Sequence, residues 1–146
     1  MKKGWLLLAI MMCFCCVKKQ EINTQQNCSS TVGHKYQMYT MSEMSALMEQ
    51  MYLDNQRLKQ CIQSGDSIGK FPNHFLKIHT AVMTDPAEND SFFKEQAALF
   101  IKAQELIYED PVNAKKHFND GVDACINCHE VKCGGPITKI RKLYIQ

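Results

Sequence analysis

The sequence lacks an excess of charge of either sign, since its 146 residues carry 17 basic and 15 acidic side chains. This balance gives no indication of a nucleic-acid-binding surface. The sequence also lacks apolar–polar alternation over the length of a strand, which argues against a β-sheet. It contains no phosphate-binding loop, no carboxylate pair and no serine–histidine–aspartate constellation, so we expect no turnover enzyme.

The apolar stretch at residues 5–12 is too short to form a stable transmembrane helix. Two lysines precede it, and a positive start followed by a short apolar stretch predicts an export signal over residues 1–16. Cys13, Cys15 and Cys16 follow this stretch. We expect Cys16 to be lipidated, because Cys15 places a small side chain just before the cleavage point. Ordinary cleavage, which would release a free periplasmic protein, is the alternative.

The segment that follows, residues 17–39, is polar and predicts a flexible tether. Residues 40–146 have the length of one domain. Removal of Lys2 and Lys3 with the signal leaves fifteen charges of each sign. The sequence therefore predicts a nearly neutral, single-domain protein in the periplasm, anchored to the membrane if it is a lipoprotein.

Cys125, Cys128 and His129 form the pattern C-x-x-C-H, which is the attachment signature of a c-type haem. In such a site the two thiols add to the two vinyl groups of the porphyrin, and the histidine ligates the iron. Export agrees with this interpretation, because haem of this type is attached outside the bacterial cytoplasm. The motif therefore predicts one covalent haem c, with His129 as the proximal iron ligand.

The same residues leave two other interpretations open. Cys125, Cys128, His129 and Cys133 supply enough ligands for a zinc site, although zinc sites favour short, turn-rich loops and this motif ends a helical segment. A redox dithiol is the other interpretation. A thioredoxin-like dithiol expects a βαβ context, and no β-pattern precedes Cys125.

Apolar residues recur at steps of three and four in four segments, as in helices packed in a bundle. Ser42 is a plausible N-cap of the first segment, and Gly65 follows its end. Short loops favour antiparallel neighbours, so the sequence predicts an all-α, antiparallel four-helix bundle over residues 40–146. The predicted helices cover residues 41–63, 72–85, 91–110 and 111 onward, and 137–145 predicts a short extra turn or helix at the bundle end.

Two of these segments carry the residues of interest on one face. On the last, Cys125 and His129 continue the apolar seam, so both are predicted to face inward. The first helix has Asn55 as a polar interruption. Its predicted apolar face consists of Met41, Met44, Met48, Met51, Leu58 and Ile62.

With the motif on its last helix, the chain resembles the cytochrome c′ family over residues 40–133. The resemblance implies a haem-binding bundle in which a residue of the first helix covers the distal face of the haem. Some members leave the iron five-coordinate, their low-spin relatives place a methionine there, and many are homodimers. The family carries an aromatic and then a basic residue where this chain has Lys132 and Cys133. Charge near the haem is therefore expected from Lys132.

Alignment with the family's distal segment favours Met48 as the distal iron ligand, with Met44 or Met51, one turn away, as alternatives. A further alternative is that no methionine binds the iron and that all of them fill the core. A thioether ligand favours ferrous iron and makes the site six-coordinate, which suits electron transfer. A five-coordinate iron would instead bind nitric oxide or carbon monoxide.

Other candidate residues receive weaker interpretations. Cys133 is expected to pair more easily with Cys28, in the tether, than with Cys61. The basic cluster near the C-terminus is either a solvated face or a surface that steers an acidic redox partner. Its members are Lys139, Arg141 and Lys142. The remaining histidines are expected to be surface or partly buried polar residues, and they are His34, His74, His79 and His117.

Together these patterns predict a monohaem c-type cytochrome that transfers electrons to or from a periplasmic or membrane redox partner. The alternatives are a gas-binding protein of the cytochrome c′ kind and a module that holds a metal without haem or uses a redox dithiol.

Overall fold

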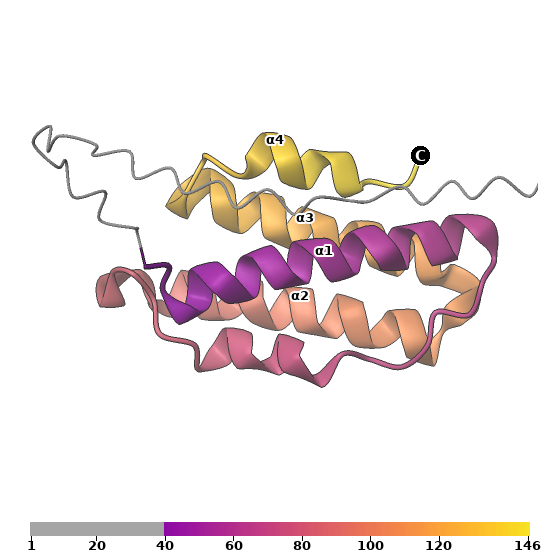
Figure 1. The fold of residues 1–146 in the computed structure, drawn as a ribbon, viewed down its shortest axis with the longest axis horizontal. Coiled ribbons are helices and arrows are strands. Elements are labelled where there is room, and N and C mark those ends of the chain that lie inside the picture. Colours follow the sequence, from indigo (N-terminus) through magenta and orange to yellow (C-terminus); the bar gives the residue numbers. More distant parts are fainter. Residues whose placement is uncertain (1–39) are drawn as a thin grey trace, which may run out of the picture. The chain divides into compact units, whose positions relative to one another are not determined.

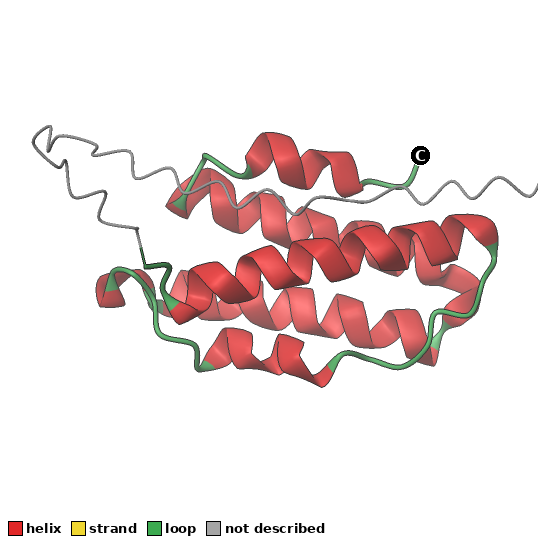
Figure 2. Cartoon of the chain, viewed as in Figure 1, coloured by secondary structure: helices red, strands yellow, loops and turns green. Residues whose placement is uncertain are grey.

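The computed structural model describes residues 40–146, and within that range the secondary structure is helical, with no β-strand (Figures 1 and 2). The all-α prediction is thus confirmed. The predicted signal, the lipidation site Cys16 and the tether lie outside the described residues. The elements are α1 (Glu43–Ser64), η1 (Asn73–His79), η2 (Pro86–Glu88), α2 (Ser91–Glu109), η3 (Pro111–Asn113), α3 (Ala114–Lys132), α4 (Ile137–Ile140) and η4 (Arg141–Leu143), where η marks a 3₁₀ helix.

Capping fixes both ends of α1. The Ser42 hydroxyl accepts a hydrogen bond from the Ser45 backbone N–H at 3.1 Å, as expected of an N-cap. Gly65 follows the helix with a φ of 75°, a left-handed conformation that glycine adopts without steric cost. Both predicted caps are confirmed, and α1 begins two residues later than predicted because Met41 precedes the cap. No helix among residues 40–146 has the length and apolarity to cross a bilayer.

The turn between α2 and α3 is organised by Asp110. Its carboxylate accepts hydrogen bonds from Asn113 Nδ2 at 2.8 Å and from His117 Nε2 at 3.0 Å. The bonds to His117 and then Asn113 lower the pKa of Asp110 below its ordinary value. Pro111 follows and opens the 3₁₀ turn that leads into α3. This short connection lets α2 and α3 lie side by side along their length (Figure 1).

The second predicted helix is wrong in type and length. It is a 3₁₀ helix of seven residues, η1, and Val82, predicted to be on its apolar face, is 60 % exposed. The chain leaves helical geometry at Thr80, and the Val82 carbonyl then accepts a hydrogen bond from the Met44 N–H at 3.0 Å. The first turn of α1 has backbone N–H groups with no partner within the helix, and this bond satisfies one of them. The backbone of Val82 therefore stabilises the start of α1.

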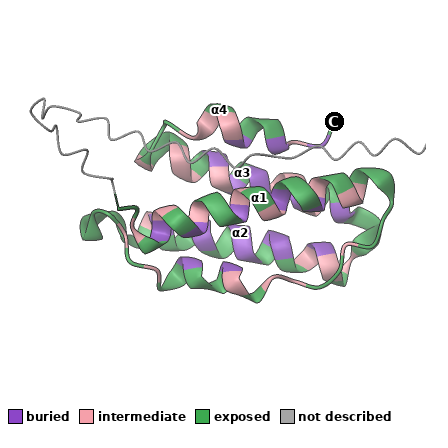
Figure 3. Cartoon of the chain, viewed as in Figure 1, coloured by how far each residue is buried: buried purple, intermediate pink, exposed green. Residues whose placement is uncertain are grey.

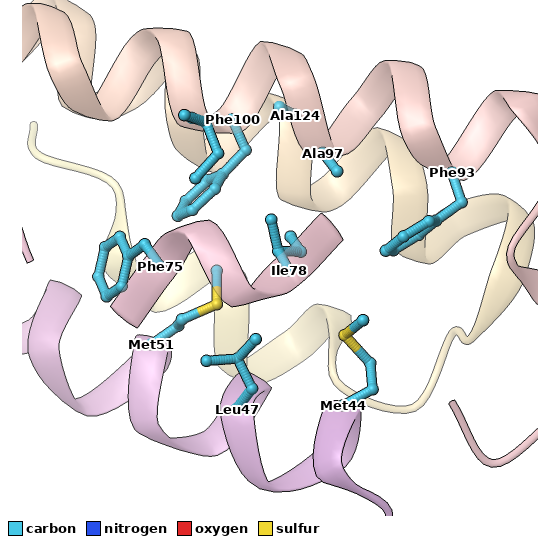
Figure 4. Packing of buried hydrophobic residues seen from close by; sticks show 10 residues of the cluster. Met44, Leu47, Met51, Phe75, Ile78, Phe93, Ala97, Phe100 and Ala124 are labelled. Carbon is cyan, nitrogen blue, oxygen red and sulfur yellow. The ribbon is translucent and has the colours of Figure 1, made fainter. Parts of the chain in front are cut away.

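The core consists of two apolar clusters, built from the faces of the long helices that meet (Figure 3). In the first cluster, Phe75 and Ile78 of η1 insert between α1 and α2 (Figure 4). The second cluster lies near the opposite end of α1 and is covered by the C-terminal segment, whose Ile140, Leu143 and Ile145 are buried. Lys59 of α1 holds this segment by donating hydrogen bonds to two of its backbone carbonyls. The predicted extra turn thus exists and lies beside α3.

Two buried polar residues separate the clusters along the helices. Asn55 of α1 is 4 % exposed and Gln104 of α2 is 1 % exposed. Gln104 Nε2 donates to Asn55 Oδ1 at 2.9 Å, and Asn55 Nδ2 donates to the Met51 carbonyl at 2.8 Å. Gly121 of α3 leaves room for this pair, since a Cβ there would lie 3.2 Å from Gln104 Nε2. The predicted polar interruption in α1 is therefore an internal hydrogen-bonded contact between two helices.

Replacing Asn55 by alanine is expected to lower the free energy of unfolding by about 1–3 kcal/mol, because Gln104 is left buried without a partner. The control Gln56→Ala, on the exposed face of α1, is expected to change it by less than about 0.5 kcal/mol. The double variant Asn55→Leu/Gln104→Leu removes both polar groups and should recover much of the loss. Denaturant unfolding measures all three. A single variant as stable as the control would contradict the role of this pair.

Candidate functional site

The motif residues lie in the last three turns of α3, where helical geometry places positions i, i+3 and i+4 on one face. Cys125, Cys128 and His129 are half-buried, and all three line a small cavity of about 30 Å³. The cavity is closed by side chains of three other elements, which are Met48 and Met51 of α1, Ile78 of η1, and Phe93, Gln96, Ala97 and Phe100 of α2. Residues far apart in the sequence thus converge on the motif.

The prediction that Cys125 and His129 lie on a buried seam needs correction, because neither residue is fully buried. The buried residues on the same part of α3 are Ala124 and Ile126, one on each side of Cys125. Ala124 belongs to the cluster shared with α2, and Ile126 to the cluster beneath the C-terminal segment. Helix α3 therefore packs on two flanks, and the motif faces the space between them.

A wider cleft of about 380 Å³ adjoins the cavity, between the start of α1 and the end of α3. Met48, Phe93, Cys128 and His129 line both spaces. A porphyrin is much larger than the inner cavity, so a bound haem would have to fill part of the cleft as well. Of the residues that could hold it, Cys128 and His129 lie along the boundary of these two spaces, and Cys125 lines the cavity alone.

The ring of His129 is oriented by the backbone. Its Nδ1 donates a hydrogen bond to the Cys133 carbonyl at 3.0 Å, just beyond the end of α3. Such a bond fixes the tautomer in which Nε2 carries the free lone pair, which is how metal-binding histidines are commonly held. The donor set and the orientation of His129 therefore fit the haem that the motif implies.

The three candidate methionines occupy different positions. Met44 and Met51 are buried in the first cluster, where their side chains face η1 and α2 (Figure 4). Met44 lines only the cleft and Met51 only the cavity, whereas the half-buried Met48 lines both. Met48 of α1 and His129 of α3 thus both line the cavity and the cleft. Met41, also predicted on this face, is 51 % exposed.

Burial controls the chemistry of the motif thiols. It raises the pKa of Cys125 from 9.0 to about 12, and the charge of Cys128 adds to the effect. Burial also raises the pKa of Cys128. Both are therefore thiols at neutral pH in the haem-free fold, and a thiol is a poor nucleophile compared with its thiolate.

Cys133 and Cys61 cannot pair with each other in this fold. Cys133 is exposed and lines the cleft beside Ser42, at the start of α1. Cys61 lies about 27 Å further along the same helix, well beyond the span of a disulfide. The predicted partner Cys28 lies outside the described residues, so that pairing stays a prediction.

The four residues of the zinc interpretation do not form a ready ligand set. Within residues 40–146, no group of three or more histidine, cysteine, aspartate or glutamate side chains is placed to hold a metal ion.

Lys132 lines the cleft, but its charge is already paired. Its ammonium group lies 2.6 Å from Asp90 and 2.8 Å from Glu88, at the start of α2 and in η2. Its hydrogen bond lowers the pKa of Asp90, and the bonds to Asp90 and Glu88 raise the pKa of Lys132. This contact joins the end of α3 to the start of α2. The sequence showed Lys132 but gave no sign of its partners, 42 and 44 residues earlier in the chain.

Two of the other described histidines, and two cations of the C-terminal cluster, lie beside carboxylates. His74 pairs with Asp54 at 2.9 Å and His117 with Asp110, and His79 is exposed. None of these three lines the cavity or the cleft. His34 lies outside the described residues. Of the basic cluster, Lys139 pairs with Glu49 and Arg141 with Glu130, which weakens it as a surface for an acidic partner.

Sequence reasoning missed Gln96, a polar residue that lines the cavity and is 9 % exposed. An apolar pattern marks the inner face of this helix by its phenylalanines and cannot show that a polar residue shares that face. The spacing of Gln96, three from Phe93 and four from Phe100, was the available signal. Leu47 of α1, which lies one residue outside the predicted methionine seam, was also missed and is buried in the first cluster.

Comparison of the chain with protein-family models, with curated proteins and with solved structures finds no match.

In the folded, haem-free protein, alkylation is expected to be fast at Cys133, slower at Cys128 and slowest at Cys125. A pKa that rises from 9.0 to about 12 lowers the thiolate fraction of Cys125 at neutral pH about a thousandfold. Mass spectrometry of peptides after timed labelling measures the order. In strong denaturant the three rates should become similar. Fast labelling of Cys125 in the folded protein would contradict the packing of this side chain against both apolar clusters.

Proposed function

We propose that this protein is an exported monohaem c-type cytochrome that transfers electrons. Cys125 and Cys128 would hold the haem through thioethers, and His129 would ligate its iron. The observation that carries the proposal is the convergence of both thiols, a histidine with free Nε2 and a methionine on one cavity. The haem, when bound, supplies the one-electron chemistry. The chain supplies ligands, burial and exclusion of water, and no turnover chemistry is proposed.

The finer architecture is part of this proposal. We assign α1, η1, α2 and α3 to an antiparallel four-helix bundle of the cytochrome c′ kind, in which η1 takes the place of one full helix. Support comes from the alternating chain direction that the short α2–α3 connection imposes, and from the position of the motif on the last long helix. The family usually has an aromatic and then a basic residue after the histidine. This chain has Lys132 and Cys133 at those positions, so the resemblance does not extend to them.

Met48 is the proposed second axial ligand. It shares both the cavity and the cleft with His129, and it lies on α1, whereas His129 lies on α3. A thioether ligand stabilises ferrous iron relative to a nitrogen ligand and so raises the reduction potential. The apolar walls, which include Phe93, Phe100 and Ile78, would limit the access of bulk water to a bound haem.

A five-coordinate, gas-binding site is the second candidate function. The observation in its favour is that the cavity beside Met48 and His129 is mostly apolar and large enough for a small molecule. If Met48 does not ligate the iron, nitric oxide or carbon monoxide would have access to it. Binding of carbon monoxide to the reduced wild-type protein separates the two functions, because a six-coordinate site resists it.

The proposed location is the periplasm, with a lipid on Cys16 as anchor and a periplasmic or membrane redox partner. The raised pKa values of Cys125 and Cys128 add a constraint on maturation. Thiols in this environment react slowly, so haem attachment should precede closure of the cavity. A homodimer, as in many members of the family that the chain resembles, is part of the same proposal.

Co-expression with a haem-attachment system is expected to give a red protein with a pyridine haemochrome spectrum typical of two thioethers. Cys125→Ala and Cys128→Ala should each give the shifted spectrum of a single thioether, or lose the haem. Cys133→Ala is the matched control and should keep the spectrum of the wild type. A colourless wild-type protein would contradict the proposal.

Met48→Ala is expected to abolish the methionine-to-iron charge-transfer band of the oxidised protein and to admit carbon monoxide to the reduced one. Met44→Ala and Met51→Ala, which leave the shared position untouched, serve as controls and should retain the band. Absorption spectroscopy of the three variants measures this. Loss of the band in Met44→Ala or Met51→Ala alone would transfer the ligand role to that residue.

A further inference from the structure

Gln96 is a buried polar residue that the fold does not explain. It lies on the inner face of α2 between two phenylalanines, and its side-chain oxygen Oε1 is buried without a hydrogen-bond partner. An unpaired buried amide oxygen destabilises a protein by about 1–3 kcal/mol, so such a group normally has a partner. The other two buried polar residues, Asn55 and Gln104, bond to each other. Gln96 has no equivalent contact.

The position of Gln96 connects it with the candidate site. It lines the inner cavity together with Met48, Cys128 and His129. Gln104, whose Oε1 is also unpaired, does not line that cavity. The one polar side chain of α2 at the cavity is therefore an amide, and it lines the same cavity as Met48 and His129.

We propose that the Gln96 amide donates a hydrogen bond to the ligand that occupies the iron position opposite His129. This inference rests on the proposed haem. A thioether or a bound diatomic molecule offers lone pairs and no proton, so the amide must present its NH₂ group. Rotation about the terminal side-chain bond exchanges the oxygen and the NH₂ without changing the volume of the residue.

The surroundings make such a bond effective. The cavity walls next to Gln96 are Phe93, Ala97 and Phe100, which offer no competing polar group. A hydrogen bond in such a low-dielectric site is stronger than one in water. Hydrogen-bond donors in the distal pocket are among the features by which a protein controls what a haem iron binds. In the haem-free protein, one water molecule in the cavity is the natural partner of the amide.

Carbon monoxide is a suitable probe, because a donor that bonds to its oxygen lowers the C–O stretching frequency. The experiment uses the reduced holoprotein carrying Met48→Ala, which opens the sixth position. Adding Gln96→Leu, which has nearly the same volume, is expected to raise the C–O stretching frequency. It should also speed carbon monoxide dissociation about threefold to tenfold, as expected when one hydrogen bond is lost. Infrared spectroscopy and ligand-exchange kinetics measure the two effects.

The double variant Asn55→Leu/Gln104→Leu in the same background is the matched control, since it replaces two buried amides that lie away from the cavity and leaves neither partner unpaired. It should leave the stretching frequency unchanged. A frequency that does not move with Gln96→Leu would overturn the inference and leave Gln96 with a buried water only. That outcome is distinct from failure of the proposed function, in which no covalent haem forms and no carbon monoxide band exists in any variant. If the wild type binds carbon monoxide directly, the same comparison is made without Met48→Ala.

Discussion

The candidate site depends on how α3 ends. In its last turn the Lys132 ammonium bonds to Glu88 and Asp90, which fixes the end of α3 against the start of α2. One residue further, the Cys133 carbonyl accepts the hydrogen bond from His129 Nδ1. The first contact holds the helix and the second holds the imidazole ring. Without the second contact the motif would still share one helical face, but the free nitrogen of His129 would not be determined.

The division of the core assigns separate roles to the two ends of the molecule. The second cluster, beneath the C-terminal segment, is apolar, packs α1, α2 and α3 together, and reaches the motif at Ile126. The first cluster supplies the walls of the cavity. The pair Asn55–Gln104 lies between them and joins α1 to α2.

Local sequence patterns predicted those features of the fold that depend on interactions between neighbouring residues. The caps Ser42 and Gly65, the break at 110–111 and the spacing within the motif depend on neighbouring residues, and they could be predicted from the sequence alone. The prediction of helices failed where the structure depends on contacts between residues that are far apart in the sequence. The segment after Pro72 has helical spacing, yet the Val82 backbone pairs with the start of α1. A periodic pattern cannot show such a contact, because it records only which side chains share a face.

The same limitation applies to the site. The residue types at 125, 128 and 129 predicted the chemistry, and a methionine seam predicted a set of possible distal ligands. The cavity that distinguishes Met48 from its neighbours exists only once α1 and α3 are packed. The pairing of Lys132 and the burial of Gln96 likewise depend on α2, and they alter the charge and the polarity that the sequence assigned to the pocket.

The central claim is that the chain carries one porphyrin through thioethers at Cys125 and Cys128. The most direct test is the intact mass of the matured protein under denaturing and reducing conditions. The account predicts a mass higher than that of the bare polypeptide by one haem, with both motif cysteines blocked to alkylation. A mass equal to that of the bare polypeptide, with both cysteines alkylated, would contradict it.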